Sequence, residues 1–207
     1  MNNKGEANRS VRMTRRRLSD ALITLLLEKP VREITVRELT GLARVSRGTF
    51  YFHYSDIYEL MDRVEQDQID AMERLMDDIL PRLNEDSTPE SLCMLYRYLD
   101  ENDGICSALL GPNGDPAFRR RLQTLIEERC VGYIAPQESA TPNQRYMVAF
   151  AVQGCFGNIE AWLQRGKPES AAEMAHTTWT AVRAVKQAAA SQRIQSNQAL
   201  FTALLHL

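Results

Sequence analysis

The chain has 207 residues, of which 44% are hydrophobic and 25% charged, a composition typical of a globular protein. It contains no apolar run long enough to span a bilayer and no secretory signal, so we expect a cytoplasmic protein without membrane association. The net charge of −2 is unevenly distributed, with +4 over residues 1–60 and −6 over residues 61–207. A basic N-terminal end indicates contact with a polyanion. Ordinary solvated surface charge would give the same distribution.

Helical periodicity runs through the sequence, and no alternating pattern extends beyond a few residues, so an all-α fold is predicted. Residues 1–9 are predicted to form a disordered N-terminal tail. A first helix is expected over 10–28, where an apolar stripe ends at Lys29-Pro30. The residues of that stripe are Leu18, Ala21, Leu22, Leu25 and Leu26.

Two short helices follow, each with a recognisable cap. Thr35 and Glu38 have the spacing of a capping box, which opens the second helix. Ser46 is placed to cap a third helix, which ends near Tyr54. The inward face of the second helix is predicted to consist of Val36, Leu39, Leu42 and Ala43.

The rest of the chain indicates a series of longer helices. A helix is predicted over 55–80, and further helices over about 89–101, 104–110, 116–134, 142–165, 170–190 and 192–206, with prolines and glycines at several boundaries. These elements divide the chain into a three-helix, homeodomain-like helix-turn-helix domain over 10–60 and a helical bundle domain over 61–207 for ligand binding and dimerisation.

Several kinds of site are not indicated. The four cysteines lie far apart without a Cys-x-x-Cys pair, and the three histidines show no metal-ligand spacing. No nucleophile motif or phosphate-binding loop is visible. We therefore expect no enzymatic activity, no metal and no cofactor.

The two short helices and the three-residue turn between them have the pattern of a helix-turn-helix. Phe50 and Tyr54, one turn apart, are predicted to pack inward. Arg47 and Tyr51 then point outward and offer a guanidinium and a hydroxyl, groups that contact base edges and phosphates. Gly48 lets the backbone approach DNA closely, at a cost of about 1 kcal/mol of helix stability relative to alanine.

The segment Val-Ser-Arg-Gly-Thr-Phe-Tyr-Phe-His-Tyr at 45–54, preceded by Ile-Thr-Val-Arg-Glu-Leu-Thr, resembles the signature of TetR/AcrR-family transcription regulators. The resemblance covers residues 14–65 and implies phosphate contacts by Thr35 and Tyr51. The positions that it places at or near DNA are Thr35, Ser46, Arg47, Thr49, Tyr51 and His53.

The sequence departs from this family at two positions. Arg44 stands where the turn usually has glycine, so either the turn differs or it tolerates about 1 kcal/mol of strain. We expect Arg44 to add a phosphate contact. Ile57 stands where many members have a phosphate-binding lysine, which puts that contact in question. The segments 109–118 and 150–174 more loosely resemble the branch that activates dihydroxyacetone-kinase operons.

In this family the helical body usually contains a ligand cavity. Residues at helical spacing are more often ordinary core, but some are candidates to line the cavity, and a bulky residue at Gly157 is expected to fill it. The candidates are Met94, Tyr96, Tyr133, Met147, Phe150, Gln153, Phe156, Asn158 and Trp162.

The predicted helices over 141–165 and 170–190 each have a face of small residues. Such faces pack within the chain or, as the resemblance implies, pair with their copies in a four-helix homodimer interface. The small residues are Ala149, Ala151, Gly154, Gly157 and Ala161 on the first helix, and Ala171, Ala175, Ala181, Ala184 and Ala188 on the second.

The sequence therefore predicts a ligand-responsive, homodimeric transcription regulator that binds a palindromic operator in double-stranded DNA and acts as a repressor. The alternative is an interaction protein or transcriptional activator whose C-terminal domain binds a protein partner instead of a small molecule.

Overall fold

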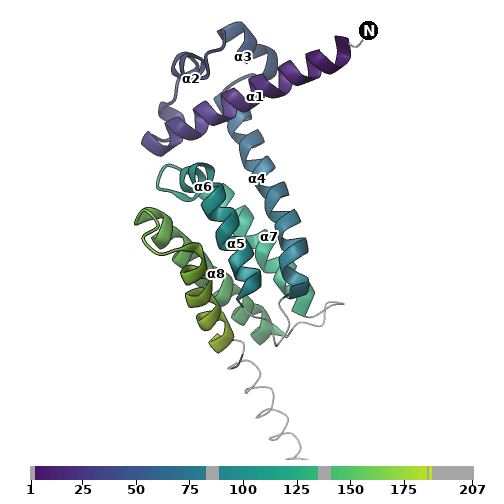
Figure 1. Ribbon diagram of the computed structural model, residues 1–207, viewed down its shortest axis with the longest axis vertical. Coiled ribbons are helices and arrows are strands. Elements are labelled where there is room, and N and C mark those ends of the chain that lie inside the picture. Colours follow the sequence, from purple (N-terminus) through teal and green to yellow (C-terminus); the bar gives the residue numbers. More distant parts are fainter. Residues whose placement is uncertain (1–2, 83–88, 135–140, 186, 188–207) are drawn as a thin grey trace, which may run out of the picture. The chain divides into compact units, whose positions relative to one another are not determined.

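A computed structural model describes residues 3–82, 89–134, 141–185 and 187 as helices and their connections (Figure 1), and no strand occurs among them. This confirms the predicted all-α fold. The chain divides into two compact units, one of Met1–Arg74 with Asn102–Arg121 and one of Leu75–Glu101 with Leu122–Leu207. The unit that holds the helix-turn-helix thus includes more of the chain than the domain predicted over 10–60.

The first unit begins with α1, which spans Asn3–Glu28. Residues 3–9 are helical where the sequence predicts a disordered tail. The segment contains no proline, and extending an existing helix costs far less than starting one. The predicted apolar stripe of α1 is confirmed, since Leu18, Ala21, Leu22 and Leu26 are buried and Leu25 is half-buried.

The next elements form the helix-turn-helix and the first part of a long helix. In chain order they are a 3-10 helix at Val31–Glu33, α2 at Val36–Ala43, α3 at Arg47–His53 and α4 at Ile57–Ile79, followed by a 3-10 helix at Leu80–Arg82. Both short helices occur where the caps predict them.

One residue of α2 lies on a different face from the one predicted. Leu42 is 49% exposed, whereas Thr40 is buried. At 100° per residue, Leu39, Thr40 and Ala43 share one side of the helix, and Leu42 falls outside it. The prediction that Leu42 faces inward is therefore wrong, and the Thr40 hydroxyl is accommodated because it donates to the backbone oxygen of Val36 at 2.7 Å.

A later helix completes the first unit. α6 spans Asp103–Leu110 and packs against α1. Beyond it, the Asn113 amide nitrogen donates to the backbone oxygen of Leu26 at 3.0 Å. The loop after α6 therefore caps a carbonyl near the C-terminal end of α1, where helix carbonyls lack partners within the helix.

The same unit contains a buried carboxylate. Glu65 of α4 is 2% exposed, and one of its oxygens lies 3.3 Å from the Arg121 guanidinium of α7, which spans Pro116–Ile134. The other oxygen, Oε1, has no hydrogen-bond partner. Burial, together with the nearby carboxylates of Asp115 and Asp62, raises the pKa of Glu65 to about 7, while Arg121 opposes this shift.

Because the folded state holds this proton more tightly than the unfolded state, Glu65 contributes stability below about pH 4.5 that is lost as the pH rises through 7. We expect the free energy of unfolding of the wild type, relative to that of Glu65→Gln, to fall by about 2 kcal/mol between pH 5 and pH 8. Urea denaturation of both proteins at the two pH values measures this difference. An unchanged difference between them would contradict the prediction.

The second unit contains the remaining helices. They are the last part of α4, α5 at Glu90–Glu101, most of α7, α8 at Pro142–Gln164 and a helix over 171–185. The predicted stretch 192–206 and position Ala188 lie outside the described residues. Within the described part of the chain, no helix is long and apolar enough to cross a membrane.

Candidate nucleic-acid interface

The N-terminus of α2 is held by a complete capping box. The Thr35 hydroxyl accepts from the backbone nitrogen of Glu38 at 3.2 Å, and the Glu38 carboxylate accepts from the Thr35 nitrogen at 3.0 Å and the Thr35 hydroxyl at 2.8 Å. Lys29 pairs with the same carboxylate at 2.7 Å. The hydrogen bonds from Lys29 and then Thr35 lower the pKa of Glu38 to about 2. Thr35 therefore lies exposed at a fixed position where α2 begins.

The turn between α2 and α3 contains a left-handed residue. Arg44 has φ 54° and ψ 46°, its nitrogen donates to the oxygen of Gly41, and the nitrogen of Val45 donates to that of Thr40. These bonds form a Schellman motif, in which the left-handed position is usually glycine. The turn thus keeps the geometry of a glycine turn and tolerates the strain of an arginine. The Arg44 side chain is exposed.

Replacing Arg44 by glycine is expected to raise the free energy of unfolding by about 0.5–1 kcal/mol, because only glycine adopts this conformation without strain. Arg44→Ala is the matched control, since it removes the guanidinium but keeps the strained backbone. Thermal or urea denaturation measures the difference. Equal stability of the two variants would show that the backbone at position 44 is not strained. If Arg44 also contacts a phosphate, both variants bind DNA equally less well.

α3 presents two different faces. Ser46 caps it by accepting from the Thr49 nitrogen at 3.0 Å. Phe50 and Tyr54 are buried, whereas Arg47 is exposed and Tyr51 is 57% exposed. This confirms the predicted division into an anchoring face and an outward face. Gly48 is exposed beside Arg47, and Thr49 is half-buried.

α1 adjoins the C-terminal end of α3. His53 is half-buried, and its pKa is lowered mainly by burial and further by the positive charge of Arg15 on α1. All the positions predicted to lie at DNA thus occur in one helix-turn-helix of the first unit. Their contact with DNA stays a prediction.

Two neighbouring positions add to this description. Ile57 is buried at the start of α4, so it serves the core and supplies no phosphate contact. Phe52 on α3 is 80% exposed, a position that the sequence analysis does not single out. The exposure of Phe52 could have been predicted from its spacing to Phe50, because a residue two positions after a buried residue lies on another side of the helix.

The residues proposed for a ligand cavity fall into two groups. Tyr96, Phe156 and Trp162 are buried, and Met94, Met147 and Asn158 are half-buried. Tyr133, Phe150 and Gln153 are exposed. Gly157 is also exposed, and a Cβ atom added there meets nothing within 4 Å. Among the described residues, a bulky residue at 157 therefore occupies open space on α8 and fills no cavity.

Some of the buried candidates form one cluster. The Tyr96 and Trp162 rings meet edge to face, with centroids 5.4 Å apart. The Tyr96 hydroxyl pairs with that of Thr178 at 2.7 Å, and the Asn158 amide donates to Thr178 at 3.4 Å. Burial raises the pKa of Tyr96 to about 12. Sequence reasoning missed Thr178, because nothing local distinguishes it from a surface threonine.

Known proteins resemble this chain. Residues 86–183 match the TetR-type family described as "Transcriptional regulator C-terminal region". The uncharacterized HTH-type transcriptional regulator YxbF of Bacillus subtilis strain 168 is 27% identical over 67 residues, which cover 32% of this chain and only 18% of that relative.

Two solved structures share the fold. A TetR transcriptional regulator from Streptococcus agalactiae 2603V has a TM-score of 0.60 and 23% identity, over 87% of this chain and 99% of that one. The dihydroxyacetone kinase operon activator DhaS has a TM-score of 0.55 and 17% identity, over 83% and 94% of the two chains.

An all-helical chain with a capped helix-turn-helix near its N-terminus and a helical C-terminal region has the architecture of helix-turn-helix transcription regulators. Residues 86–183 match the C-terminal region of TetR-type transcriptional regulators, and the chain has the fold of TetR-family regulators. The matched family and these structural neighbours are transcription regulators, which agrees with the prediction that the chain is not an enzyme.

Proposed function

We propose that this protein is a cytoplasmic, ligand-responsive homodimeric regulator that binds a palindromic operator and represses transcription. The observation that carries the proposal is the geometry of α3. Phe50 and Tyr54 anchor the helix, while Arg47 and Tyr51 are left exposed on its outer side. A guanidinium and a phenol on a short, rigidly capped helix are suited to base edges and phosphates in the major groove.

Dimerisation is supported by an apolar stripe on α8. Tyr146 and Phe150 are 74% and 67% exposed, and Gly154, Gly157 and Ala161 continue the same side of the helix. Large exposed aromatic side chains beside small residues indicate a surface that another helix covers. We propose that a second copy covers it. On the helix over 171–185, Ala181 and Ala184 are exposed in a similar way, whereas Ala175 is buried.

A small molecule bound to the helical body is the proposed signal. The methionine, aromatic and amide candidates within an acidic region suit a partly apolar ligand that is uncharged or weakly cationic. The ligand has to favour one arrangement of the DNA-binding helices, typically by about 1–3 kcal/mol of coupling. α4 follows the helix-turn-helix in the chain, and its residues are divided between the two units, so it is the proposed route of this coupling.

The second candidate is a transcriptional activator whose body binds a protein partner. The fold similarity to DhaS, which is described as an operon activator, favours it. Co-expression and pull-down separate the two candidates, because control by a ligand alone requires no second protein. Repression is the simpler mechanism, since a dimer bound across a promoter blocks access without further contacts.

Selection of operators from random duplex DNA, followed by sequencing, tests the proposal. A two-fold-symmetric dimer presents two recognition helices, so the selected sites should contain inverted half-sites separated by about 34–36 Å or a multiple of it. A single asymmetric element among the selected sequences contradicts the symmetric dimer. The absence of any enriched sequence contradicts specific DNA binding.

A further inference from the structure

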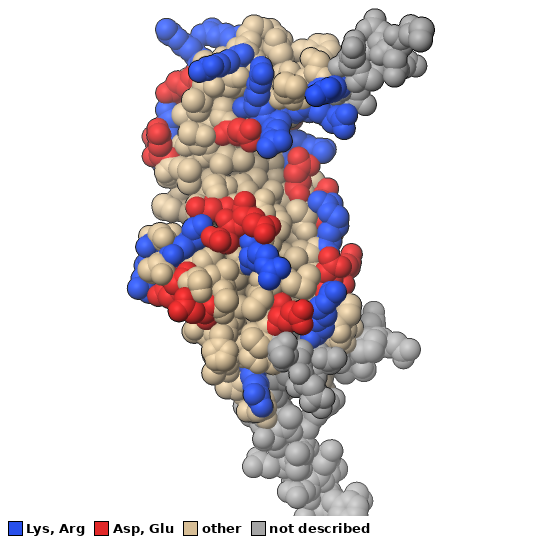
Figure 2. Space-filling model, viewed as in Figure 1, with Lys and Arg blue, Asp and Glu red and all other residues tan. Residues whose placement is uncertain are grey.

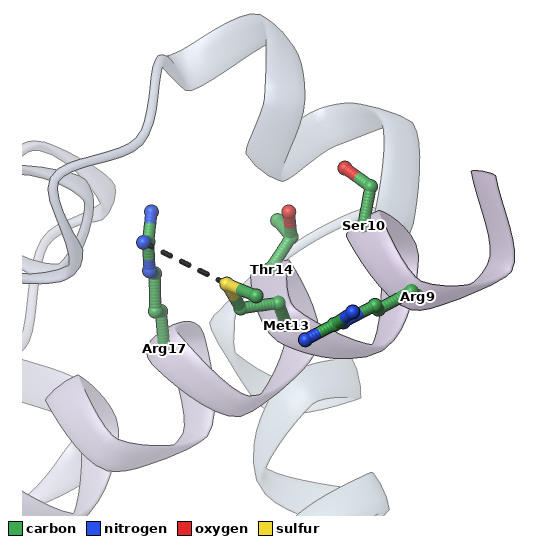
Figure 3. A pocket seen from close by; sticks show the side chains of 5 residues that line it. All are labelled: Arg9, Ser10, Met13, Thr14 and Arg17. Carbon is green, nitrogen blue, oxygen red and sulfur yellow. Dashed lines mark hydrogen bonds between the residues drawn. The ribbon is translucent and has the colours of Figure 1, made fainter. Parts of the chain in front are cut away.

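A shallow hollow of about 260 Å³ lies on the surface of α1, and the described residues that line it all belong to this helix. Figure 3 shows Ser10, Thr14 and Arg17 pointing to the same side of the helix, with Arg9 extending toward Met13. The Arg17 guanidinium donates to the Met13 sulfur at 3.8 Å. The hollow therefore offers two guanidinium groups and two hydroxyls around a thioether.

The charge of this segment is unusual. Residues 7–19 include five arginines and no acidic residue. Arg16 lies 3.9 Å from Asp20, but within the described residues neither Arg9 nor Arg17 takes part in an ion pair. Like charges one turn apart destabilise an isolated helix by a few tenths of a kcal/mol per pair. A bound polyanion would offset the repulsion between these arginines.

The segment contributes little to the core. Among the described side chains of α1, the first buried one is Leu18, and Arg9 and Ser10 are exposed. About 12 Å of helix separates Arg9 from Arg17, and over this stretch Val11 and Thr14 are half-buried while the other side chains are exposed. Figure 2 shows Lys and Arg side chains gathered over the region that α1, α2 and α3 occupy in Figure 1.

We propose that the face of α1 formed by Arg9, Ser10, Met13, Thr14 and Arg17, here called the α1 basic face, binds the phosphate backbone of DNA next to the half-site read by α3. This inference rests on the proposed DNA-binding function and extends it. The α1 basic face belongs to the same unit as the helix-turn-helix, and Arg15 lies close enough to His53 to influence its protonation. The segment of α1 that carries this face therefore lies beside α3 in the same unit.

An open hollow on a single helix suits a DNA backbone better than a small anion. One helix encloses no ligand, whereas arginines two turns apart are able to contact successive phosphates along a strand. Hydroxyl and guanidinium donors are the side-chain groups that most often bind DNA phosphates. Because phosphates carry no sequence information directly, the α1 basic face adds affinity and length of footprint without changing the base preference.

The double variant Arg9→Ala, Arg17→Ala tests the proposal against Arg12→Ala, Arg120→Ala. Both remove two positive charges from the first unit, but Arg12 lies on another side of α1 and Arg120 lies on α7. The full-length proteins are titrated with a selected operator that carries flanking base pairs, and with one trimmed to its half-sites, at 50–200 mM salt. Circular dichroism confirms that each variant is folded.

Each lost phosphate contact lowers the salt dependence of log K by about 0.9. Over a fourfold rise in salt, the affinity of the Arg9→Ala, Arg17→Ala variant should therefore fall about tenfold less than that of the wild type on the flanked operator. We expect no difference on the trimmed operator and a wild-type salt dependence for the Arg12→Ala, Arg120→Ala control.

Three results would overturn the inference: equal losses in the two double variants, an unchanged salt dependence in both, or a loss that persists on the trimmed operator. Equal losses would show that total charge, and not the α1 basic face, sets the affinity. Failure of the wild type to bind any DNA would instead reject the proposed function, so the two failures are distinguishable.

Discussion

An Arg47→Ala variant is expected to bind its operator about 5- to 150-fold more weakly than the wild type. The side chain is exposed at the first position of α3, where Ser46 fixes the start of the helix. A bidentate arginine–base pair contributes about 1–3 kcal/mol of discrimination, which gives this range. Because the contact reads a base, the variant should also lose its preference at one position of each half-site.

Tyr51→Phe provides the contrast. Its hydroxyl is expected to contact a phosphate, so the variant should bind matched and mismatched operators with the same proportional loss. Fluorescence titrations with both operators compare the two variants. Arg120→Ala serves as a control, because it removes one exposed arginine of the same unit outside the helix-turn-helix. Unchanged binding by both Arg47→Ala and Tyr51→Phe would remove the recognition role from α3.

The helix-turn-helix is predictable from sequence because its signals are local. The cap of α2 joins Thr35 to a residue three positions on, and the cap of α3 joins Ser46 to Thr49. The burial of Phe50 follows from the same short range, since one helical turn separates it from Tyr54. Leu42 shows the limit of periodicity, because an eight-residue helix leaves its inward direction poorly determined.

Other features depend on contacts between distant segments. The bond from Asn113 to Leu26 joins residues 87 positions apart, and no local pattern indicates that α6 belongs with α1. The cavity candidates show the same limit. Tyr96 and Phe150 are both aromatic residues within helices, yet Tyr96 is buried against Trp162 and Phe150 is 67% exposed. Only the packing of neighbouring helices determines which of these aromatic residues is buried.

The exposed stripe on α8 leads to a second prediction with a large effect on operator binding. Gly157→Arg is expected to convert the protein to a monomer and to weaken operator binding by about 100-fold or more. Gly157 lies on the stripe with Phe150 and Ala161, where an arginine places a charge and a long side chain between the two proposed copies. Binding through two linked half-sites gains about 10²–10⁴ in affinity over one, and the monomer loses this gain.

The variant separates dimerisation from folding because a Cβ atom at 157 meets none of the described residues within 4 Å. Gly132→Arg is the matched control, since Gly132 on α7 is also exposed and equally unobstructed. Analytical ultracentrifugation should find Gly157→Arg monomeric and Gly132→Arg dimeric. DNA titration should show that the monomer keeps wild-type affinity for an isolated half-site. A dimeric Gly157→Arg protein with unchanged operator affinity would place the interface elsewhere, because the small residues of α8 permit close helix packing only where nothing larger intervenes.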